Sequence, residues 1–141
     1  MSVPLREAFE KTHYRVELHG RWHVLGIGRP CPAPIGAWTR ASASECAWLV
    51  TPCNPQAHPL ATERNQARLA WLDRWSSMAG YRSCRSVNRD ADGQWPDEPG
   101  LLIGGMDQGM ACALGRRLGQ LAVVAVPRHA LVALVWVDAA G

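Results

Sequence analysis

The alternation of apolar and polar residues predicts a β-hairpin near the N-terminus. Residues 14–18 alternate with the two-residue period of a half-buried strand, and residues 22–27 form a second strand-like run after two turn residues. Residues 13–28 are therefore expected to fold as a hairpin. Residues 2–12 are expected to form a short helix before it. The next segment, 29–44, is rich in proline and small residues and is predicted to be a loop.

The rest of the chain alternates between strand-length apolar runs and helical spacing. An apolar run over 46–51 predicts a buried strand that Pro52 ends. A helical pattern over 62–79 follows, with Thr62 expected as its N-cap and Gly80 at its C′ position. Beyond it, the pattern predicts two paired strands, a helix and a terminal hairpin, over residues 81–87, 101–103, 107–118, 121–126 and 131–137.

The order of these elements predicts the fold class. Over residues 45–126 it is strand, helix, strand, strand, helix, strand, which is the split βαβ pattern of ferredoxin-like folds. We therefore expect an α+β two-layer sandwich with a βαββαβ core, extended by the N-terminal hairpin and by a C-terminal strand within residues 127–141. At 141 residues, the chain is expected to form a single domain over 1–141.

Composition excludes some classes of protein without indicating a function. Apolar residues make up 48% and charged residues 19%, which is typical of soluble globular domains and not of disordered chains. The net charge is only +3 and the arginines are scattered, so nucleic acid is not expected as a partner. The apolar stretch 121–137 is interrupted by Pro127, Arg128 and His129, so no membrane span is expected.

The five cysteines indicate reduced thiols rather than a disulfide framework. Their number is odd, no C-x-x-C pair occurs, and no signal-peptide pattern precedes them, so a cytoplasmic location is expected. Cys46, Cys53 and His58 lack the paired spacing of compact zinc sites, and we predict no metal and no cofactor. Cys53 and His58 are a candidate thiolate and base, against the simpler interpretation of a loop cysteine and a solvated histidine.

Two arginines occupy an unexpected position in the predicted central helix. Advancing 100° per residue places Arg64 and Arg68 on the apolar stripe that also carries Trp71 and Trp75. A guanidinium aimed at the core needs a partner, because burial of a bare cation is strongly unfavourable. Three partners are open: the carboxylate of Glu98, an anionic ligand, or water reached by an extended side chain.

An anionic ligand needs further donors, and the sequence offers several candidates. Asn54 and Asn65 supply amide donors near the helix start, whose free backbone N–H groups favour anions. Alternatively, Asn54 only ends a strand in an Asn-Pro turn. Gln120 follows a predicted helix end, where it either bonds free helix carbonyls or lines a pocket. Trp95 lies in a predicted loop, where it either packs over the core or joins an exposed binding patch.

Four short blocks of the sequence resemble a known bacterial family. Residues 50–55, 63–68, 92–99 and 113–120 read V-T-P-C-N-P, E-R-N-Q-A-R, D-G-Q-W-P-D-E-P and A-L-G-R-R-L-G-Q. In this order they resemble the family called domain of unknown function 3293. That family usually has Ala and Trp where Pro52 and Cys53 stand, and Phe where Leu118 stands. The resemblance implies a cytosolic bacterial protein without an established activity.

The function favoured by these observations is that of a non-enzymatic accessory or regulatory module. We expect it to bind a protein partner or a small anion at the end of the sheet. The predicted ligand-binding residues, none of them catalytic, are Asn54, Arg64, Asn65, Arg68, Trp95, Glu98 and Gln120. One alternative is an enzyme in which Arg68 holds an anionic substrate beside Glu98, Cys53 or His58. The other is a single-stranded nucleic-acid-binding module, which the lack of aromatic residues in 101–105 disfavours.

Overall fold

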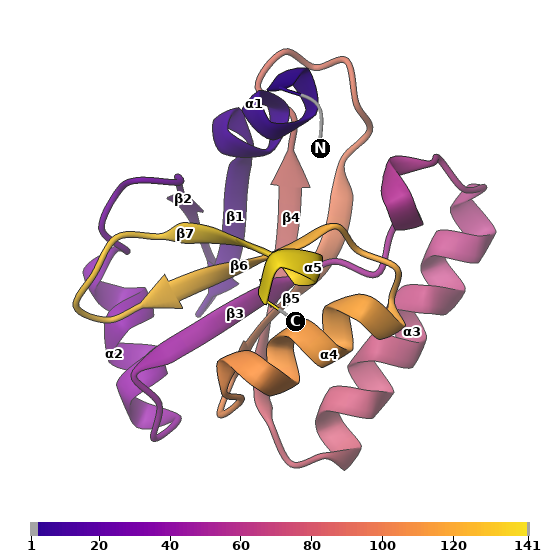
Figure 1. The fold of residues 1–141 in the computed structure, drawn as a ribbon. Coiled ribbons are helices and arrows are strands. Elements are labelled where there is room, and N and C mark those ends of the chain that lie inside the picture. The colour runs from indigo at the N-terminus through magenta and orange to yellow at the C-terminus, as the bar shows by residue number, and fades with distance from the viewer. Residues whose placement is uncertain (1–2, 141) are drawn as a thin grey trace.

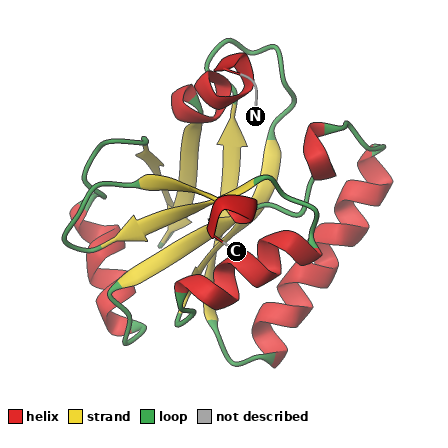
Figure 2. Ribbon diagram, viewed as in Figure 1, coloured by secondary structure: helices red, strands yellow, loops and turns green. Residues whose placement is uncertain are grey.

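The computed structural model describes residues 3–140 as a mixed α/β fold around one curled sheet (Figures 1 and 2). The helices are α1 (Val3–Lys11), α2 (Ala33–Ala41), α3 (Thr62–Met78), α4 (Gln108–Arg117) and α5 (Val137–Ala140), with a 3₁₀ turn, η1 (Pro55–Ala57). The strands are β1 (His13–Leu18), β2 (Arg21–Leu25), β3 (Cys46–Val50), β4 (Arg82–Arg89), β5 (Glu98–Gly104), β6 (Ala122–Pro127) and β7 (Ala133–Trp136). They are ordered β2-β1-β4-β5-β3-β6-β7, and all neighbours are antiparallel.

The two ends of the sheet approach each other. After β2, the Gly28 N–H donates to the Val132 carbonyl at 2.8 Å, and the Val132 N–H donates to the Arg29 carbonyl at 2.8 Å. A bridge between Pro30 and Leu131 extends this contact. The chain after β2 therefore pairs with the chain before β7, and the sheet curls toward a closed barrel.

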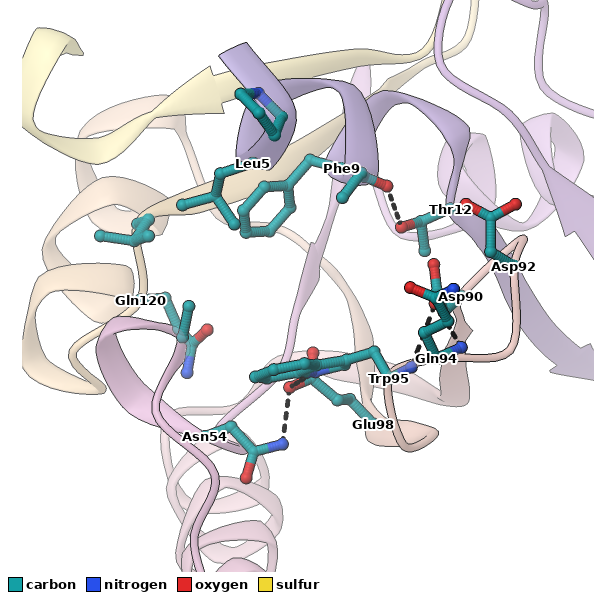
Figure 3. A pocket seen from close by; sticks show the side chains of 14 residues that line it. Leu5, Phe9, Thr12, Asn54, Asp90, Asp92, Gln94, Trp95, Glu98 and Gln120 are labelled. Atoms are coloured by element: carbon teal, nitrogen blue, oxygen red, sulfur yellow. Dashed lines mark hydrogen bonds between the residues drawn. The ribbon is translucent and has the colours of Figure 1, made fainter. Parts of the chain in front are cut away.

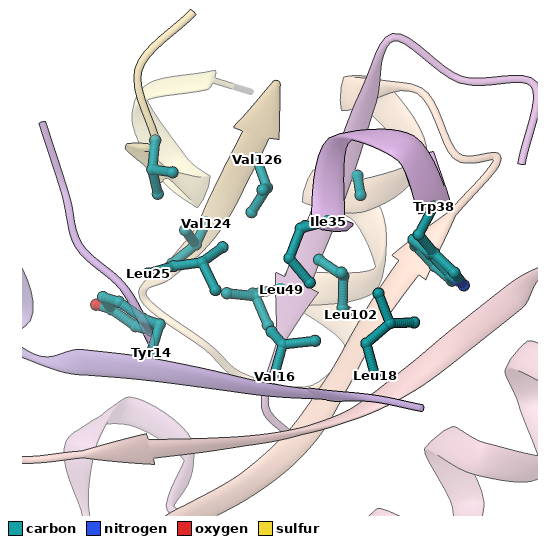
Figure 4. Packing of buried hydrophobic residues seen from close by; sticks show 12 residues of the cluster. Tyr14, Val16, Leu18, Leu25, Ile35, Trp38, Leu49, Leu102, Val124 and Val126 are labelled. Atoms are coloured by element: carbon teal, nitrogen blue, oxygen red, sulfur yellow. The ribbon is translucent and has the colours of Figure 1, made fainter. Parts of the chain in front are cut away.

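Hydrophobic residues form a core on each side of the sheet. The core inside the curl joins strand residues to two residues of α2 and includes Tyr14, Val16, Leu49, Leu102, Val126, Ile35 and Trp38 (Figure 4). On the other face, Trp48 and Ile103 pack with Leu72 of α3 and Leu114 of α4. Trp48 and its neighbour Leu49 thus point to opposite cores, as strand geometry requires. Burial on both faces explains why β3 is a continuous apolar run.

The segment 29–44, predicted as a loop, contains helix α2. Its prolines did not prevent helix formation, because Pro32 is the N-cap and Pro34 lies in the first turn, where backbone N–H groups have no partner inside the helix. Ile35, Trp38 and Thr39 follow helical spacing and are buried. This helix covers the sheet face opposite α3 and α4, so helices flank both faces rather than one as expected for two layers.

Glycines follow the C-terminal ends of α3 and α4, whereas the N-cap of α3 differs from the predicted residue. Gly80 and Gly119 adopt φ of +82° and +71°, and each follows its helix as a left-handed terminal residue, as the sequence predicts for Gly80. Asp107 caps α4 by accepting a hydrogen bond from the Met110 N–H at 2.8 Å. The N-cap of α3 is Ala61, one residue before the predicted Thr62, and no side chain caps it.

Strand boundaries differ from the predictions where they matter for function. Both predicted terminal hairpins are confirmed, as β1–β2 and β6–β7. However, β4 extends to Arg89 and β5 begins at Glu98, so the predicted loop over 88–100 shortens and Glu98 belongs to the sheet. The segment predicted as a C-terminal strand continues from β7 into α5, and residue 141 lies outside the described residues. Among residues 3–140, no helix is both long and apolar enough to cross a membrane.

Candidate functional site

A cavity of about 460 Å³ lies between α1 and the connection from β4 to β5 (Figure 3). It is lined by Pro4, Leu5, Ala8, Phe9, Thr12, Asn54, Ala57, Asp90, Asp92, Gln94, Trp95, Glu98, Gln120 and Leu121. Four of the residues predicted to bind a ligand are therefore in its wall: Asn54, Trp95, Glu98 and Gln120. These four residues come from three separate parts of the sequence, at 54, at 95–98 and at 120, which the fold brings to one end of the sheet.

Asn54 is the structural centre of the cavity floor. It follows the end of β3, is 3% exposed, and has a φ of 50°, a left-handed conformation that asparagine tolerates better than most residues. Its Oδ1 accepts hydrogen bonds from the Leu60 N–H at 2.9 Å and from Asn65 Nδ2 at 2.8 Å. Its Nδ2 donates to Glu98 Oε2 at 2.8 Å. The Asn-Pro turn predicted from sequence is present, and its side chain is also the link between α3 and β5.

The Glu98 carboxylate lines the cavity, and only one of its two oxygens has hydrogen-bond partners among the described residues. Its Oε2 accepts hydrogen bonds from Asn54 Nδ2 at 2.8 Å and from Trp95 Nε1 at 3.1 Å. Its Oε1 accepts none from the residues that the structure describes. Burial raises the pKa of Glu98, and the hydrogen bonds from Trp95 and Asn54 oppose that rise.

The close approach of β5 to β3 positions Glu98. Gly100 is buried, and a Cβ at this position would meet the Val50 carbonyl oxygen. Thr51 Oγ1 donates to the Pro99 carbonyl at 2.9 Å, which fixes the start of β5 beside the end of β3. Only glycine allows this approach, so the glycine determines where the carboxylate stands.

The connection between β4 and β5 holds Trp95 against the cavity. Asp90 Oδ2 accepts hydrogen bonds from the backbone N–H groups of Gln94 at 2.8 Å and of Trp95 at 3.0 Å. Arg89 and Asp97 close the base of the connection with an ion pair at 3.1 Å. These contacts, together with the bond from Trp95 Nε1 to Glu98, orient the indole ring along the cavity wall (Figure 3).

Helix α1 forms the opposite, apolar wall. Pro4, Leu5, Ala8 and Phe9 line the cavity from this helix. The Phe9 ring packs edge-to-face on Trp136 with a centroid distance of 5.4 Å, and the Phe9 carbonyl accepts a hydrogen bond from Tyr14 at 2.7 Å. No residue of α1 is fully buried, and Arg6 and Phe9 of this helix both contact the Trp136 ring.

Arg68 points inward as predicted, but its partners are carbonyl groups. Its Nε donates to the Pro52 carbonyl at 2.6 Å, and one of its terminal nitrogens donates to the Leu118 carbonyl. The anticipated pairing with Glu98 is wrong: among the described residues, ion pairs join Arg89 to Asp97 and Arg128 to Glu45 only. The carbonyls of Pro52 and Leu118 have no other hydrogen-bond partner among the residues that the structure describes, and they supply the partial negative charge that a guanidinium needs.

Of the other predicted residues, Arg64 and Asn65 lie outside the cavity lining, and Gln120 lies within it. Arg64 is exposed on the first turn of α3, which corrects its predicted inward position. Asn65 lies behind the floor, where its Oδ1 accepts from the Asn54 N–H at 3.1 Å. Gln120 Nε2 donates to the Cys53 carbonyl at 2.9 Å, while its backbone N–H bonds the Gly115 carbonyl of α4 at 2.9 Å.

Cys53 and His58 are not arranged as a thiolate and base. Cys53 is 1% exposed, its Sγ lies 3.5 Å from the Pro99 carbonyl, and burial raises its pKa, so the neutral thiol is favoured. His58 is exposed directly after η1 and shares no hydrogen bond with Cys53 among those of the described residues. No group of three or more His, Cys, Asp or Glu side chains within the described part of the chain is arranged to hold a metal ion.

Comparison with known proteins identifies the family. A family model with the description "Protein of unknown function (DUF3293)" matches residues 50–123. The chain belongs to the DUF3293 family. The match confirms the resemblance carried by the four sequence blocks and spans all seven predicted ligand-binding residues. No curated protein and no solved structure matches the chain.

The residues matched by the DUF3293 family model include only part of the cavity lining. The floor, from Asn54 to Leu121, lies within the matched residues, whereas the α1 wall lies before them. Sequence reasoning missed the α1 wall and the carboxylates Asp90 and Asp92. The amphipathic spacing of Leu5, Ala8 and Phe9 was the available signal for the wall. Nothing in the sequence indicated that this helix would cover the end of the sheet.

Proposed function

We propose that this DUF3293 protein is a non-enzymatic accessory module that binds a positively charged group of a protein partner or small ligand in the α1 cavity. The observation that carries this proposal is Glu98: a largely buried carboxylate in the cavity lining whose Oε1 has no partner among the described residues. A buried carboxylate that lacks a counterion favours a cation at its free oxygen.

The charge of the cavity wall supports a cationic ligand. Asp90, Asp92 and Glu98 are lining residues, and the lining contains no Lys, Arg or His. None of these three carboxylates forms an ion pair with a described residue. This arrangement differs from the rest of a chain that carries a net charge of +3. It replaces the small anion expected from the sequence, because that expectation depended on Arg64 and Arg68 reaching the site.

The aromatic and apolar parts of the wall support a ligand that combines a cation with a hydrophobic portion. Trp95 and Phe9 both line the cavity, and aromatic ring faces attract ammonium and guanidinium groups. Leu5 and Ala8 provide apolar contact beside them. An alkyl- or aryl-ammonium group, or the end of a Lys or Arg side chain, satisfies both requirements.

Calorimetric titration at constant ionic strength tests the proposal with three probes that share one ring: phenethylammonium, 2-phenylethanol and phenylacetate. We expect the cation to bind most tightly and the carboxylate most weakly. Glu98→Gln and Trp95→Ala should each weaken the cation at least fivefold. Glu63→Gln, an exposed change on α3, is the charge-matched control. Tighter binding of phenylacetate would restore the anion hypothesis, and no heat with any probe at millimolar concentration would refute ligand binding in this cavity.

A second candidate function is an enzyme in which Glu98 transfers a proton to a bound substrate. The raised pKa of Glu98 and its free Oε1 in a cavity favour this candidate. Conversion of a bound ligand, followed by NMR, distinguishes the two functions. Loss of conversion with retained binding in Glu98→Gln would support the enzyme, whereas recovery of the unchanged ligand supports the binding module.

We also propose that the residues from β3 to β6 form a ferredoxin-like core in a bacterial, cytoplasmic protein. The order β4-β5-β3-β6, with helices connecting β3 to β4 and β5 to β6, is compatible with a split βαβ arrangement. All five cysteines are free, which is compatible with a reducing compartment.

A further inference from the structure

A second surface, unrelated to the α1 cavity, lies where α3 runs beside α4. It is a cleft of about 390 Å³ lined by Trp71, Arg74, Trp75, Met78, Ala79 and Arg117. None of these residues lines the α1 cavity. Met78 is 87% exposed, the highest exposure among the large hydrophobic residues of the described chain. An exposed apolar residue bordering an aromatic cleft is a feature of docking surfaces.

The aromatic residues of this surface form a continuous stack. The Arg117 guanidinium lies 4.8 Å from the Trp71 ring centroid. Trp71 stacks on Trp75 at 6.3 Å with an interplanar angle of 22°, and Trp75 contacts Tyr81 at 5.7 Å with an angle of 39°. Each tryptophan therefore has two aromatic or cationic neighbours, both tryptophans are half-buried, and Met78 is the exposed apolar residue beside them.

The charge of this surface is positive. Arg74 and Arg117 are both exposed lining residues, and the lining contains no carboxylate. Neither side chain forms a hydrogen bond or ion pair with a described residue. The Arg117 guanidinium lies over the Trp71 ring, and its N–H groups have no hydrogen-bond partner among the described residues, so they are available to a carboxylate.

We propose that the cleft docks a short acidic segment of a partner protein, with an apolar side chain beside Met78 and carboxylates on Arg74 and Arg117. The complementary charges of the two arginines favour an acidic segment. Single-stranded nucleic acid is disfavoured because its sites combine a positively charged groove along the backbone with rings for base stacking, whereas this lining has only two arginines, one of which lies over a tryptophan ring. A second copy of the chain is disfavoured because a two-fold contact would place Arg74 and Arg117 against the same arginines.

Selection from a displayed library of random 12-residue peptides tests this proposal without assuming a partner. We expect enriched peptides to combine Asp or Glu with Leu, Phe or Trp. Fluorescence anisotropy with one enriched peptide should show at least tenfold weaker binding to the double variant Arg74→Glu/Arg117→Glu, and at least threefold weaker binding to Met78→Ser. The matched control, Arg40→Glu/Arg85→Glu, changes two exposed arginines away from the cleft and should bind as the wild type does.

Three outcomes would overturn the proposal. One is a library that yields no acidic, apolar consensus. Another is peptide binding that survives both Met78→Ser and the Arg74/Arg117 double variant. The third is tighter binding of a 12-nucleotide oligo-dT than of the selected peptide. Circular dichroism melting of each variant confirms that lost binding does not reflect lost folding, and Met78→Ser tests the surface without changing the stack.

Discussion

Asn54 and Asn65 hold each other through two hydrogen bonds in opposite directions. The Asn54 N–H donates to Asn65 Oδ1 at 3.1 Å, and Asn65 Nδ2 donates to Asn54 Oδ1 at 2.8 Å. This pair joins the end of β3 to the first turns of α3. Because Asn54 also donates to Glu98, the pair connects the helix to the carboxylate of the cavity. The proposed binding of a cation beside Glu98 therefore depends on these hydrogen bonds, one partner of which, Asn65, lies outside the cavity lining.

Removal of the Asn54 side chain should destabilise the protein strongly. Asn54→Ala removes the acceptor of the Leu60 N–H and the closer of the two acceptors of Asn65 Nδ2, and it places alanine at a φ of 50°. We expect the free energy of unfolding to fall by about 2–4 kcal/mol, measured by urea denaturation. Asn54→Gly relieves the backbone strain but not the lost hydrogen bonds, so it should recover only about 1 kcal/mol. Full recovery in Asn54→Gly would contradict the role of the side chain.

The two arginines on α3 should behave very differently. Arg68→Ala removes the donors to the Pro52 and Leu118 carbonyls, so we expect a loss of about 1–3 kcal/mol in the free energy of unfolding. Arg68→Lys should not restore this loss, because one ammonium does not reproduce the guanidinium fork. Arg64→Ala, an exposed change on the same helix, should alter stability by less than about 0.5 kcal/mol. Equal effects of Arg64→Ala and Arg68→Ala would argue against the inward contacts.

Glu98 should give the domain a characteristic pH dependence. Burial raises its pKa above the ordinary value of 4.5, so the folded state holds this proton more tightly than the unfolded state does. Its contribution to stability is therefore greatest below pH 4.5 and is lost as pH rises through the folded-state pKa. The stability of Glu98→Gln relative to wild type should accordingly increase with pH in urea denaturation between pH 4 and pH 8. A difference that is flat, or that decreases with pH, would contradict the raised pKa.

Ligand binding should show the opposite pH dependence. A cation next to Glu98 favours the ionised carboxylate, so the affinity for phenethylammonium should increase as pH rises through the pKa of Glu98. In Glu98→Gln the affinity should change less over the same range. Titration calorimetry at several pH values measures both curves. Parallel curves for the two proteins would mean that Glu98 does not face the ligand.

Most of the fold was predictable from local patterns, and the failures share a physical cause. The strands and the two long helices carry periodic apolar residues, so their type was evident from the sequence. Helix α2 was missed because Pro32 and Pro34 indicate a loop by composition, although both stand where a helix start tolerates proline. The boundary of β5 was missed because Glu98 and Pro99 are unusual strand residues, and only pairing with Asn88 and Val87 makes them part of the sheet.

The sequence predicted several residues of the candidate site but not the charge of the site. Asn54, Trp95, Glu98 and Gln120 were identified as separate candidates, and the fold places all four in one wall. The partners of Arg68 were not predictable, because the free carbonyls of Pro52 and Leu118 exist only after β3 and α4 have formed. Because Arg68 bonds these carbonyls and does not line the cavity, the charged residues of the lining are acidic rather than basic.

The last prediction concerns the glycine that sets the position of Glu98. Gly100→Ala places a Cβ against the Val50 carbonyl oxygen, and a backbone atom in the centre of a sheet has no room to move away. We expect a loss of more than about 2 kcal/mol in the free energy of unfolding, together with weakened binding of phenethylammonium. Gly36→Ala is the matched control, because its Cβ would lie 3.6 Å from Cys31 Sγ inside α2, an ordinary contact. Alanine also favours the helix, so Gly36→Ala should leave stability unchanged or raise it by up to about 1 kcal/mol. Similar losses in both variants would show that the close approach of β5 to β3 has no special role.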